Sequence, residues 1–285
     1  DLMEHAFISL DTIDQILAAW VERRNVILSG PPGTGKSWLA RRLAWLLAGL
    51  KDERRVLALQ FHQSYAYEDF IRGWRPGKDS FELVDGPFLR FCEMARADTD
   101  KPYVLLIDEI NRGNLSRIFG EVLSLIERDK RSTEYAIRLA NHRDGEAPFF
   151  IPDNLYILGT MNSADRSLAV VDYALRRRFR FFKLDPAFNR DEFSNYLAGT
   201  LEVHSEMIQR IVESFRKLND EIASDRSLGP GYQIGHSFFT ALGENQAPDQ
   251  AWFESIVRQE ILPLLEEYWF DKPDRVLKWT SRLIP

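Results

Sequence analysis

Several groups of residues in this chain have the types and spacing that phosphoryl transfer requires. The run Gly30-Pro-Pro-Gly-Thr-Gly-Lys-Ser37 matches G-x-x-x-x-G-K-[ST] in full. Gly33 and Gly35 let the backbone fold around phosphate oxygens where a Cβ would clash. Lys36 is expected to reach the β- and γ-phosphates, and the Ser37 hydroxyl to bind Mg²⁺. The predicted nucleotide-binding residues here are Gly30, Pro31, Pro32, Gly33, Thr34, Gly35, Lys36, Ser37 and Trp38.

Two adjacent acids supply the second part of this chemistry. Asp108 and Glu109 directly follow the apolar run Tyr103–Ile107, so a strand would deliver them to the carboxyl edge of a sheet, where ligands bind in open α/β folds. Neighbouring strand residues point to opposite sides, so the two acids cannot share a role. We expect Asp108 to hold Mg²⁺ with Ser37, and Glu109 to orient the attacking water.

Polar residues after a later apolar run complete the set. Asn162 follows the run 155–160, where its amide can contact the γ-phosphate or the water; the alternative is an ordinary turn former. Arg176, Arg177 and Arg178 lie near the end of a predicted helix, 168–177. Consecutive helix residues point about 100° apart, so they cannot all enter one site. The alternative for these arginines is a solvated basic helix end.

The elements that must position these residues follow from hydrophobic periodicity. Apolar runs predict strands, and spacings of three and four predict helices. The strands are 25–29, 56–61, 103–107, 155–160 and 179–184, and helices are 13–21, 37–50, 115–126 and 168–177. This alternation indicates an α/β fold, a parallel sheet sandwiched by helices. After 185–186 the pattern changes to helices at 207–222 and 252–267, so we predict a nucleotide-binding domain at 1–187 and a small α-helical domain at 188–285.

Composition restricts the class of protein. The net charge of −6, from 37 basic and 43 acidic residues, does not favour nucleic-acid binding by the chain as a whole. A lone cysteine, Cys92, excludes an intrachain disulfide and fits a reducing, cytoplasmic setting. The apolar stretches are shorter than the roughly 18 residues that cross a bilayer, so no membrane association is expected. Because the first residue is Asp1, we also expect a domain before it.

One longer run resembles a known family. Met161-Asn-Ser-Ala-Asp-Arg-Ser-Leu-Ala-Val-Val-Asp-Tyr-Ala-Leu-Arg-Arg-Arg-Phe179 is similar to the signature of the McrB-type AAA+ GTPases, the motor subunits of restriction systems that cut modified DNA, with Ser163 in place of the family's usual Thr. The segments 61–70, 108–114, 229–237 and 264–268 are similar as well. The resemblance covers nearly the whole chain.

The resemblance implies an AAA+ domain followed by a helical lid, GTP rather than ATP as substrate, and a homo-hexameric ring. It also implies a McrC-like endonuclease subunit as partner and DNA recognition by a separate N-terminal domain. Lys36, Ser37, Asp108, Glu109 and Asn162 are its expected catalytic and binding residues. Asp165 and Arg166 would lie at the site edge or the subunit interface. Arg177 would act on the neighbour's nucleotide, Arg178 in its own subunit or at the interface, and the third arginine structurally. Guanine would be read by residues 4–10 and by 232–237, which include His236.

Other interpretations remain open at this stage. An ATP-driven remodeller of proteins, like the MoxR relatives, would share the same motifs, and preference for ATP would favour it. A nucleotide-gated assembly switch with little turnover of its own is a third hypothesis. The aromatic residues Tyr65, Tyr67, Phe70 and Trp74 lie near Arg72 and Arg75. They are compatible with base stacking, but we favour a protein interface or core.

Overall fold

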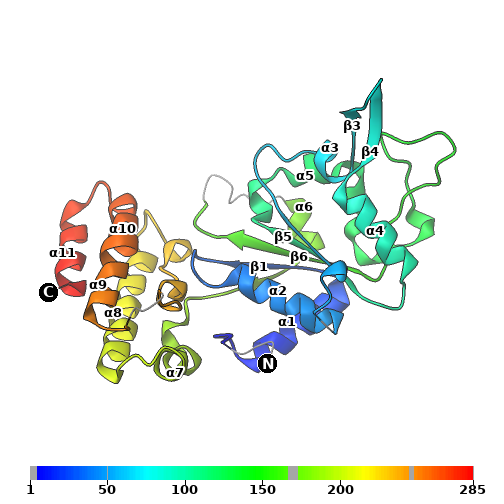
Figure 1. The fold of residues 1–285 in the computed structure, drawn as a ribbon. Coiled ribbons are helices and arrows are strands. Elements are labelled where there is room, and N and C mark those ends of the chain that lie inside the picture. The colour runs from blue at the N-terminus through cyan, green and yellow to red at the C-terminus, as the bar shows by residue number, and fades with distance from the viewer. Residues whose placement is uncertain (1–4, 50, 166–172, 244–246, 285) are drawn as a thin grey trace.

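The structure is a computed structural model that describes residues 5–49, 51–165, 173–243 and 247–284 (Figure 1). Within them, five parallel strands form one sheet in the order β2-β5-β6-β1-β7. The strands are β1 (Asn25–Gly30), β2 (Val56–Gln60), β5 (Tyr103–Asp108), β6 (Leu155–Asn162) and β7 (Arg180–Lys183). The predicted parallel sheet is therefore confirmed. Its order brings the carboxyl ends of β1, β5 and β6 together, which is where the candidate site lies.

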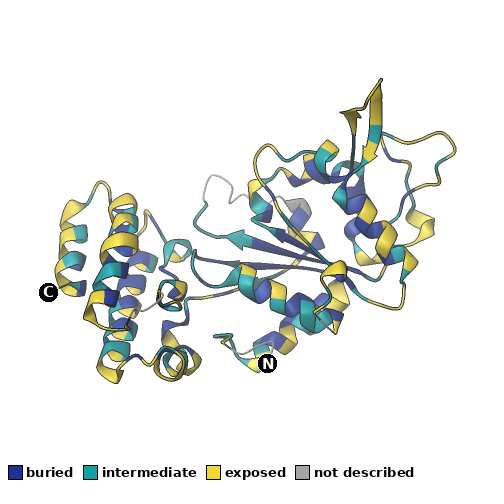
Figure 2. Ribbon diagram, in the orientation of Figure 1, coloured by how far each residue is buried: buried dark blue, intermediate teal, exposed yellow. Residues whose placement is uncertain are grey.

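Helices cover both faces of this sheet, because successive strand residues point to opposite sides. Val26 and Leu28 pack in one core, and Ile27 between them packs in the other. The first core is covered by α1 (Leu10–Arg23) and α2 (Lys36–Ala48), and the second by α4 (Pro87–Ala97), α5 (Leu115–Phe119) and α6 (Tyr173–Arg178). Figure 2 shows the central strands β1, β5 and β6 as mostly buried and the outer helix faces as exposed.

A projecting hairpin was not predicted from the sequence. The short helix α3 (Tyr67–Phe70) leads into the antiparallel strands β3 (Arg72–Pro76) and β4 (Phe81–Asp85), which extend away from the sheet (Figure 1). Buried Arg72 stabilises the base of the hairpin. Its guanidinium donates to Asp85 at 2.5 Å and to both carboxylate oxygens of Glu146 at 2.6 Å. The aromatic residues noted near Arg72 and Arg75 therefore differ in burial. Phe70 is fully buried, and Trp74 is 56% exposed on the hairpin.

The last third of the chain forms a separate helical unit (Figure 1). Its helices are α7 (Asp191–Gly199), α8 (Ser205–Ser224), α9 (Gln250–Ile256), α10 (Leu262–Tyr268) and α11 (Pro273–Leu283). Their apolar faces share one core that begins at Ala187 and extends to Leu283. This core places Ala187 with the helical unit, one residue before the division that we propose at 187/188. Among the described residues, no helix is both long and apolar enough to cross a bilayer.

The continuous helix predicted at 115–126 is wrong. The α-helix ends at Phe119, and a 3-10 helix takes over from Gly120 to Ile126. Gly120 has φ +54°, and a Cβ there would meet the Tyr67 ring at 2.9 Å. Tyr67 also donates to the Glu121 carboxylate at 2.8 Å. Periodicity within the segment could not reveal this contact with α3.

Two other predicted helices need comment. The helix predicted at 252–267 contains a π turn, Val257–Ile261, between α9 and α10. Pro263 lies two residues after this turn, and because proline has no N–H to donate, the helix adjusts its hydrogen bonding there. The helix predicted at 168–177 lies partly outside the described residues, and α6 covers its end.

Candidate nucleotide-binding site

The loop after β1 has the backbone that a phosphate cradle needs. Gly33 and Gly35 have φ of +73° and +74°, in the left-handed region that favours glycine. Gly35 is the N-cap of α2 and no side chain caps that end, so the first amides of the helix face the loop. Unpaired amides together with the positive end of a helix dipole bind anions. The loop is therefore an anion site set between a buried strand and a helix that packs one face on the sheet.

Lys36 lies folded into this loop. Its Nζ donates to the carbonyls of Gly30 at 3.0 Å and Pro31 at 2.6 Å. Burial lowers the pKa of Lys36 to about 8, against the opposing effect of Asp108 and Glu109. A buried cation bonded only to neutral oxygens gains most from an anion beside it. Lys36 thus points to a negatively charged ligand in the loop.

Ser37 and Asp108, the predicted metal ligands, are in direct contact. The Ser37 hydroxyl is 2.7 Å from Asp108 Oδ1. The Thr160 hydroxyl, from the end of β6, donates to the same oxygen at 2.5 Å. Ser37 lies in the first turn of α2, Asp108 ends β5, and Thr160 lies near the end of β6. A hydroxyl and a carboxylate side by side form the hard oxygen pair that Mg²⁺ prefers.

Glu109 leaves the strand in a conformation that is uncommon for a residue with a side chain. Its φ is +52°, and its amide donates to the Thr160 hydroxyl at 3.2 Å. The carboxylate accepts from Gln60 at 3.2 Å and pairs with Arg112 at 2.8 Å. Such backbone strain persists where surrounding contacts hold it, which is typical of functional sites. The turn separates the Glu109 carboxylate from that of Asp108.

Asn162 reaches the edge of the phosphate loop. It is the last residue of β6 and pairs in register with Gly30. The next amide, Ser163, donates to the Gly30 carbonyl at 3.1 Å, which ties the two loops together. The Asn162 side-chain oxygen accepts from the Ala164 amide at 3.3 Å, as in a turn former. Asp165 lies 3.6 Å from Arg112 at the same edge, and Arg166 lies outside the described residues.

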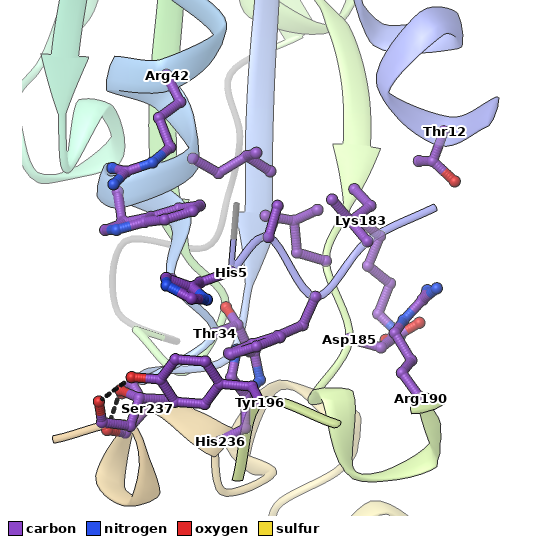
Figure 3. A pocket seen from close by; sticks show the side chains of 18 residues that line it. His5, Thr12, Thr34, Arg42, Lys183, Asp185, Arg190, Tyr196, His236 and Ser237 are labelled. Atoms are coloured by element: carbon purple, nitrogen blue, oxygen red, sulfur yellow. Dashed lines mark hydrogen bonds and ion pairs between the residues drawn. The ribbon is translucent and has the colours of Figure 1, made fainter. Parts of the chain in front are cut away.

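A cavity of about 260 Å³ opens beside the loop and is of a size for a nucleobase (Figure 3). Its walls come from the N-terminal segment, α2, the end of β7 and the helical lid. Trp38 forms part of the wall. The Arg42 guanidinium stacks on the Trp38 ring, with its Cζ 3.3 Å from the ring centroid. His236 and Ser237 face it from the lid (Figure 3), and the Ser237 amide donates to the Gly33 carbonyl at 3.0 Å.

His236 joins the lid to the chain segment that leads into it. Its Nδ1 accepts from the Ala187 amide at 3.0 Å, so this nitrogen carries no proton. Burial, and to a smaller degree the Arg190 cation, lowers the pKa of His236 to about 4. Phe7 and Phe193 pack edge-on or tilted against the ring. A neutral imidazole therefore supports the cavity wall.

Comparison with known proteins agrees with this geometry. Residues 25–179 match the family profile of the AAA domain, dynein-related subfamily. The chain belongs to this AAA family. Residues 210–277 match the α-helical lid domain of McrB, so the AAA domain carries a McrB-type lid. The expected fold, including the lid, is confirmed.

The relatives of this AAA protein include restriction components. The whole chain is 46% identical over 286 residues to the type IV methyl-directed restriction enzyme EcoKMcrB subunit of Escherichia coli K12, and spans 62% of that protein. It is 26% identical over 286 residues to the type II restriction enzyme BsuMI component YdiS of Bacillus subtilis, with 86% of this chain and 78% of the relative aligned. Neuron navigator 3 of Danio rerio aligns at 23% identity over 94% of this chain and 11% of its own length.

The arginines of this AAA protein lie far from its own phosphate loop. The carbonyl of Arg178 accepts from the side chain of Asn25, the first residue of β1, whereas the loop follows the last. Five strand steps separate these ends by roughly 17 Å. Arg178 is buried against Glu127 at 2.9 Å, and the Arg177 side chain is 66% exposed. The position does not fit the role considered for Arg178 at its own nucleotide, because its guanidinium is paired at the opposite edge of the sheet.

Three residues at the site were not predicted from the sequence: Thr160, Gln60 and Arg112. Gln60 ends β2 as Asp108 ends β5, so the strand-edge argument would have found it if the strand predicted at 56–61 had been ended one residue earlier. Thr160 was assigned to a strand but given no role. Arg112 carried no signal, because its contact with Glu109 depends on the turn that the backbone takes after β5.

Proposed function

We propose that this chain is the GTP-hydrolysing motor part of a modification-dependent restriction system. In this proposal it assembles into a homo-hexameric ring and acts with a McrC-like endonuclease subunit, which cuts the DNA. DNA recognition falls to an N-terminal domain outside this sequence, and hydrolysis drives translocation. The observation that carries the proposal is the cluster of Lys36, Ser37, Asp108 and Glu109 in a McrB-type AAA chain. The E. coli and B. subtilis relatives, both named as restriction components, support the biological setting.

Each residue has a defined task in the proposed reaction. Lys36 exchanges its carbonyl partners for the β- and γ-phosphate oxygens, and the loop amides bind the rest of the triphosphate. Glu109 orients the water that attacks the γ-phosphorus, and Asn162 contacts the γ-phosphate or the water. Ser37 and Asp108 would hold Mg²⁺, which neutralises charge on the phosphates. Arg177 of a neighbouring subunit stabilises the charge of the transition state.

The cavity beside the loop offers a reason for guanine preference. Among its described lining residues, Asp185 is the one acid. Guanine presents an N1–H and a 2-amino group on one edge, and a carboxylate can accept from both, whereas adenine offers no such pair. Asp185 is paired with Lys183 at 2.6 Å and largely exposed, so it would exchange this exposed ion pair for the base. The lid segment with His236 and the segment His5–Ile8 close the opposite walls.

The test is turnover of GTP and of ATP by the same preparation, with Glu109→Gln alongside. We expect GTP to be hydrolysed in preference to ATP, and Glu109→Gln to bind GTP normally while losing on the order of 10²-fold or more in kcat. Preference for ATP would instead favour a protein remodeller. Unchanged turnover by Glu109→Gln would remove that residue from its role.

A further inference from the structure

One carboxylate, Glu127, meets both arginines at the end of α6. Its Oε1 lies 2.9 Å from Arg178 Nε and 3.6 Å from Arg177 Nη2. The other oxygen, Oε2, accepts from Lys130 at 3.2 Å. Arg178 is buried by this pairing, whereas Arg177 extends outward with 66% of its side chain exposed. Glu127 thus fixes a buried arginine and contacts its exposed neighbour.

The backbone on both sides of this contact is held by the side chain of Asn25. This residue is fully buried at the start of β1. Its amide nitrogen donates to the carbonyl of Ile126 at 2.8 Å and to that of Arg178 at 3.1 Å. One amide group therefore joins the residue before Glu127 to the end of the arginine helix.

A buried guanidinium, that of Arg131, fixes Asn25 in turn. It donates to the Asn25 side-chain oxygen at 2.7 Å, to the Ile126 carbonyl at 2.9 and 3.0 Å, and to the Leu155 carbonyl. Burying a cation among neutral acceptors is costly unless its hydrogen bonds are satisfied, so the arrangement tolerates little displacement. The segment that carries Glu127 is accordingly rigid where it meets α6.

Two paths connect this cluster with the nucleotide site of the same subunit. β1 runs from Asn25 directly into the phosphate loop. The segment after β5 runs from Glu109 through α5 and the 3-10 helix to Ile126 and then Glu127. We propose that Glu127 is a positioning residue that holds Arg177 in place for the nucleotide of the neighbouring subunit and ties that placement to the subunit's own phosphate loop and Glu109. This inference rests on the proposed role of Arg177 in trans.

The physical reason is charge and geometry at one helix end. Without the Glu127 carboxylate, Arg177, Arg178 and Lys130 face one another with no acid between them, and Arg178 loses its buried counter-ion. An arginine that stabilises a phosphoryl transition state contributes on the order of 10³-fold or more to kcat. A displacement of about 1 Å costs on the order of 10²-fold. Loss of Glu127 should therefore lower kcat without changing nucleotide affinity.

The experiment uses Glu127→Gln, which keeps the shape and removes the charge, and Asp129→Asn as matched control. Asp129 is exposed in the same turn, with no ion pair to another described residue. Each variant is assayed for GTP turnover alone and in mixed rings with excess Glu109→Gln chains. Those chains bind GTP but cannot hydrolyse it, and they supply an intact Arg177. Arg177→Ala is assayed in the same way, and thermal melting confirms folding.

We expect Glu127→Gln to lose on the order of 10²-fold in kcat with unchanged KM. It should melt at a lower temperature, because Arg178 loses its buried counter-ion, and remain folded at the assay temperature. Asp129→Asn should match the wild type. Mixing with Glu109→Gln chains should restore turnover to the intact sites of Glu127→Gln chains, because each receives a well-placed Arg177. Wild-type kcat in Glu127→Gln would overturn the inference. The inference would also be overturned if mixing restored turnover to Arg177→Ala chains but not to Glu127→Gln chains. In that case the trans role of Arg177 would still stand. Failure to rescue Arg177→Ala would instead reject that role itself. If Glu127→Gln does not fold, Glu127→Asp replaces it, because aspartate keeps the charge but is one methylene shorter. The same turnover and mixing assays are then read in the same way.

Discussion

The neutral state of His236 makes the stability of this protein depend on pH in a calculable way. Burial lowers the pKa of His236 from its usual 6.5 to about 4, with a smaller contribution from the Arg190 cation. The unfolded chain takes up a proton on this residue below pH 6.5, and the folded chain does so only near pH 4. Acidification from pH 7 therefore favours the unfolded state. By linkage, the free energy of unfolding falls by about 2 kcal/mol at pH 5 and by about 3 kcal/mol once the effect is complete.

The matched variant is His236→Asn, whose side-chain oxygen can accept from the Ala187 amide but does not titrate. Urea unfolding followed by tryptophan fluorescence at pH 7, 6 and 5 gives the free energy of unfolding for both proteins. His236→Asn also loses ring packing with Phe7 and Phe193, so the quantity to compare is the change with pH and not the absolute stability. We expect the wild type to lose about 2 kcal/mol more than the variant between pH 7 and pH 5. Parallel pH dependence in the two proteins would refute the reasoning.

Three further substitutions test the site. Thr160→Val removes the hydroxyl that donates to Asp108, so we expect about tenfold lower kcat and a higher Mg²⁺ requirement. Both are measured by GTP turnover against Mg²⁺ concentration, and an unchanged Mg²⁺ requirement would contradict this. Gly33→Ala forces φ +73° on alanine and brings Cβ to 2.9 Å from Ser237 Oγ, so GTP affinity should fall roughly tenfold or more with the circular dichroism spectrum unchanged. Asp185→Asn should reduce the ratio of GTP to ATP affinity about tenfold, measured by competition, and an unaltered ratio would remove Asp185 from base recognition.

The local parts of the site were predictable because their geometry is determined by nearby residues. The glycine spacing of the phosphate loop dictates its backbone, and the strand before it and the helix after it followed from apolar patterns. The contact between Ser37 and Asp108 joins residues 71 positions apart, yet it was predictable as well, since the carboxyl ends of parallel strands meet at one edge of the sheet.

What could not be predicted depends on contacts between distant segments. The helix expected at 115–126 ends early because Tyr67 packs on Gly120. Arg177 and Arg178 are adjacent in sequence, and which one is buried depends on contacts with distant residues, Glu127 and Asn25. The turn at Glu109, with its contacts to Gln60 and Arg112, likewise depends on the neighbouring strands and has no local sequence signal.

The most direct test of the central claim is calorimetric titration of GTP, in the presence of Mg²⁺, into the wild type and into Lys36→Ala. If the loop at 30–37 binds the triphosphate, the wild type should bind GTP more tightly than ATP, and Lys36→Ala should lose on the order of 10²-fold in GTP affinity, since a partly buried charge-assisted contact is removed. Equal GTP affinity in the two proteins would contradict the account.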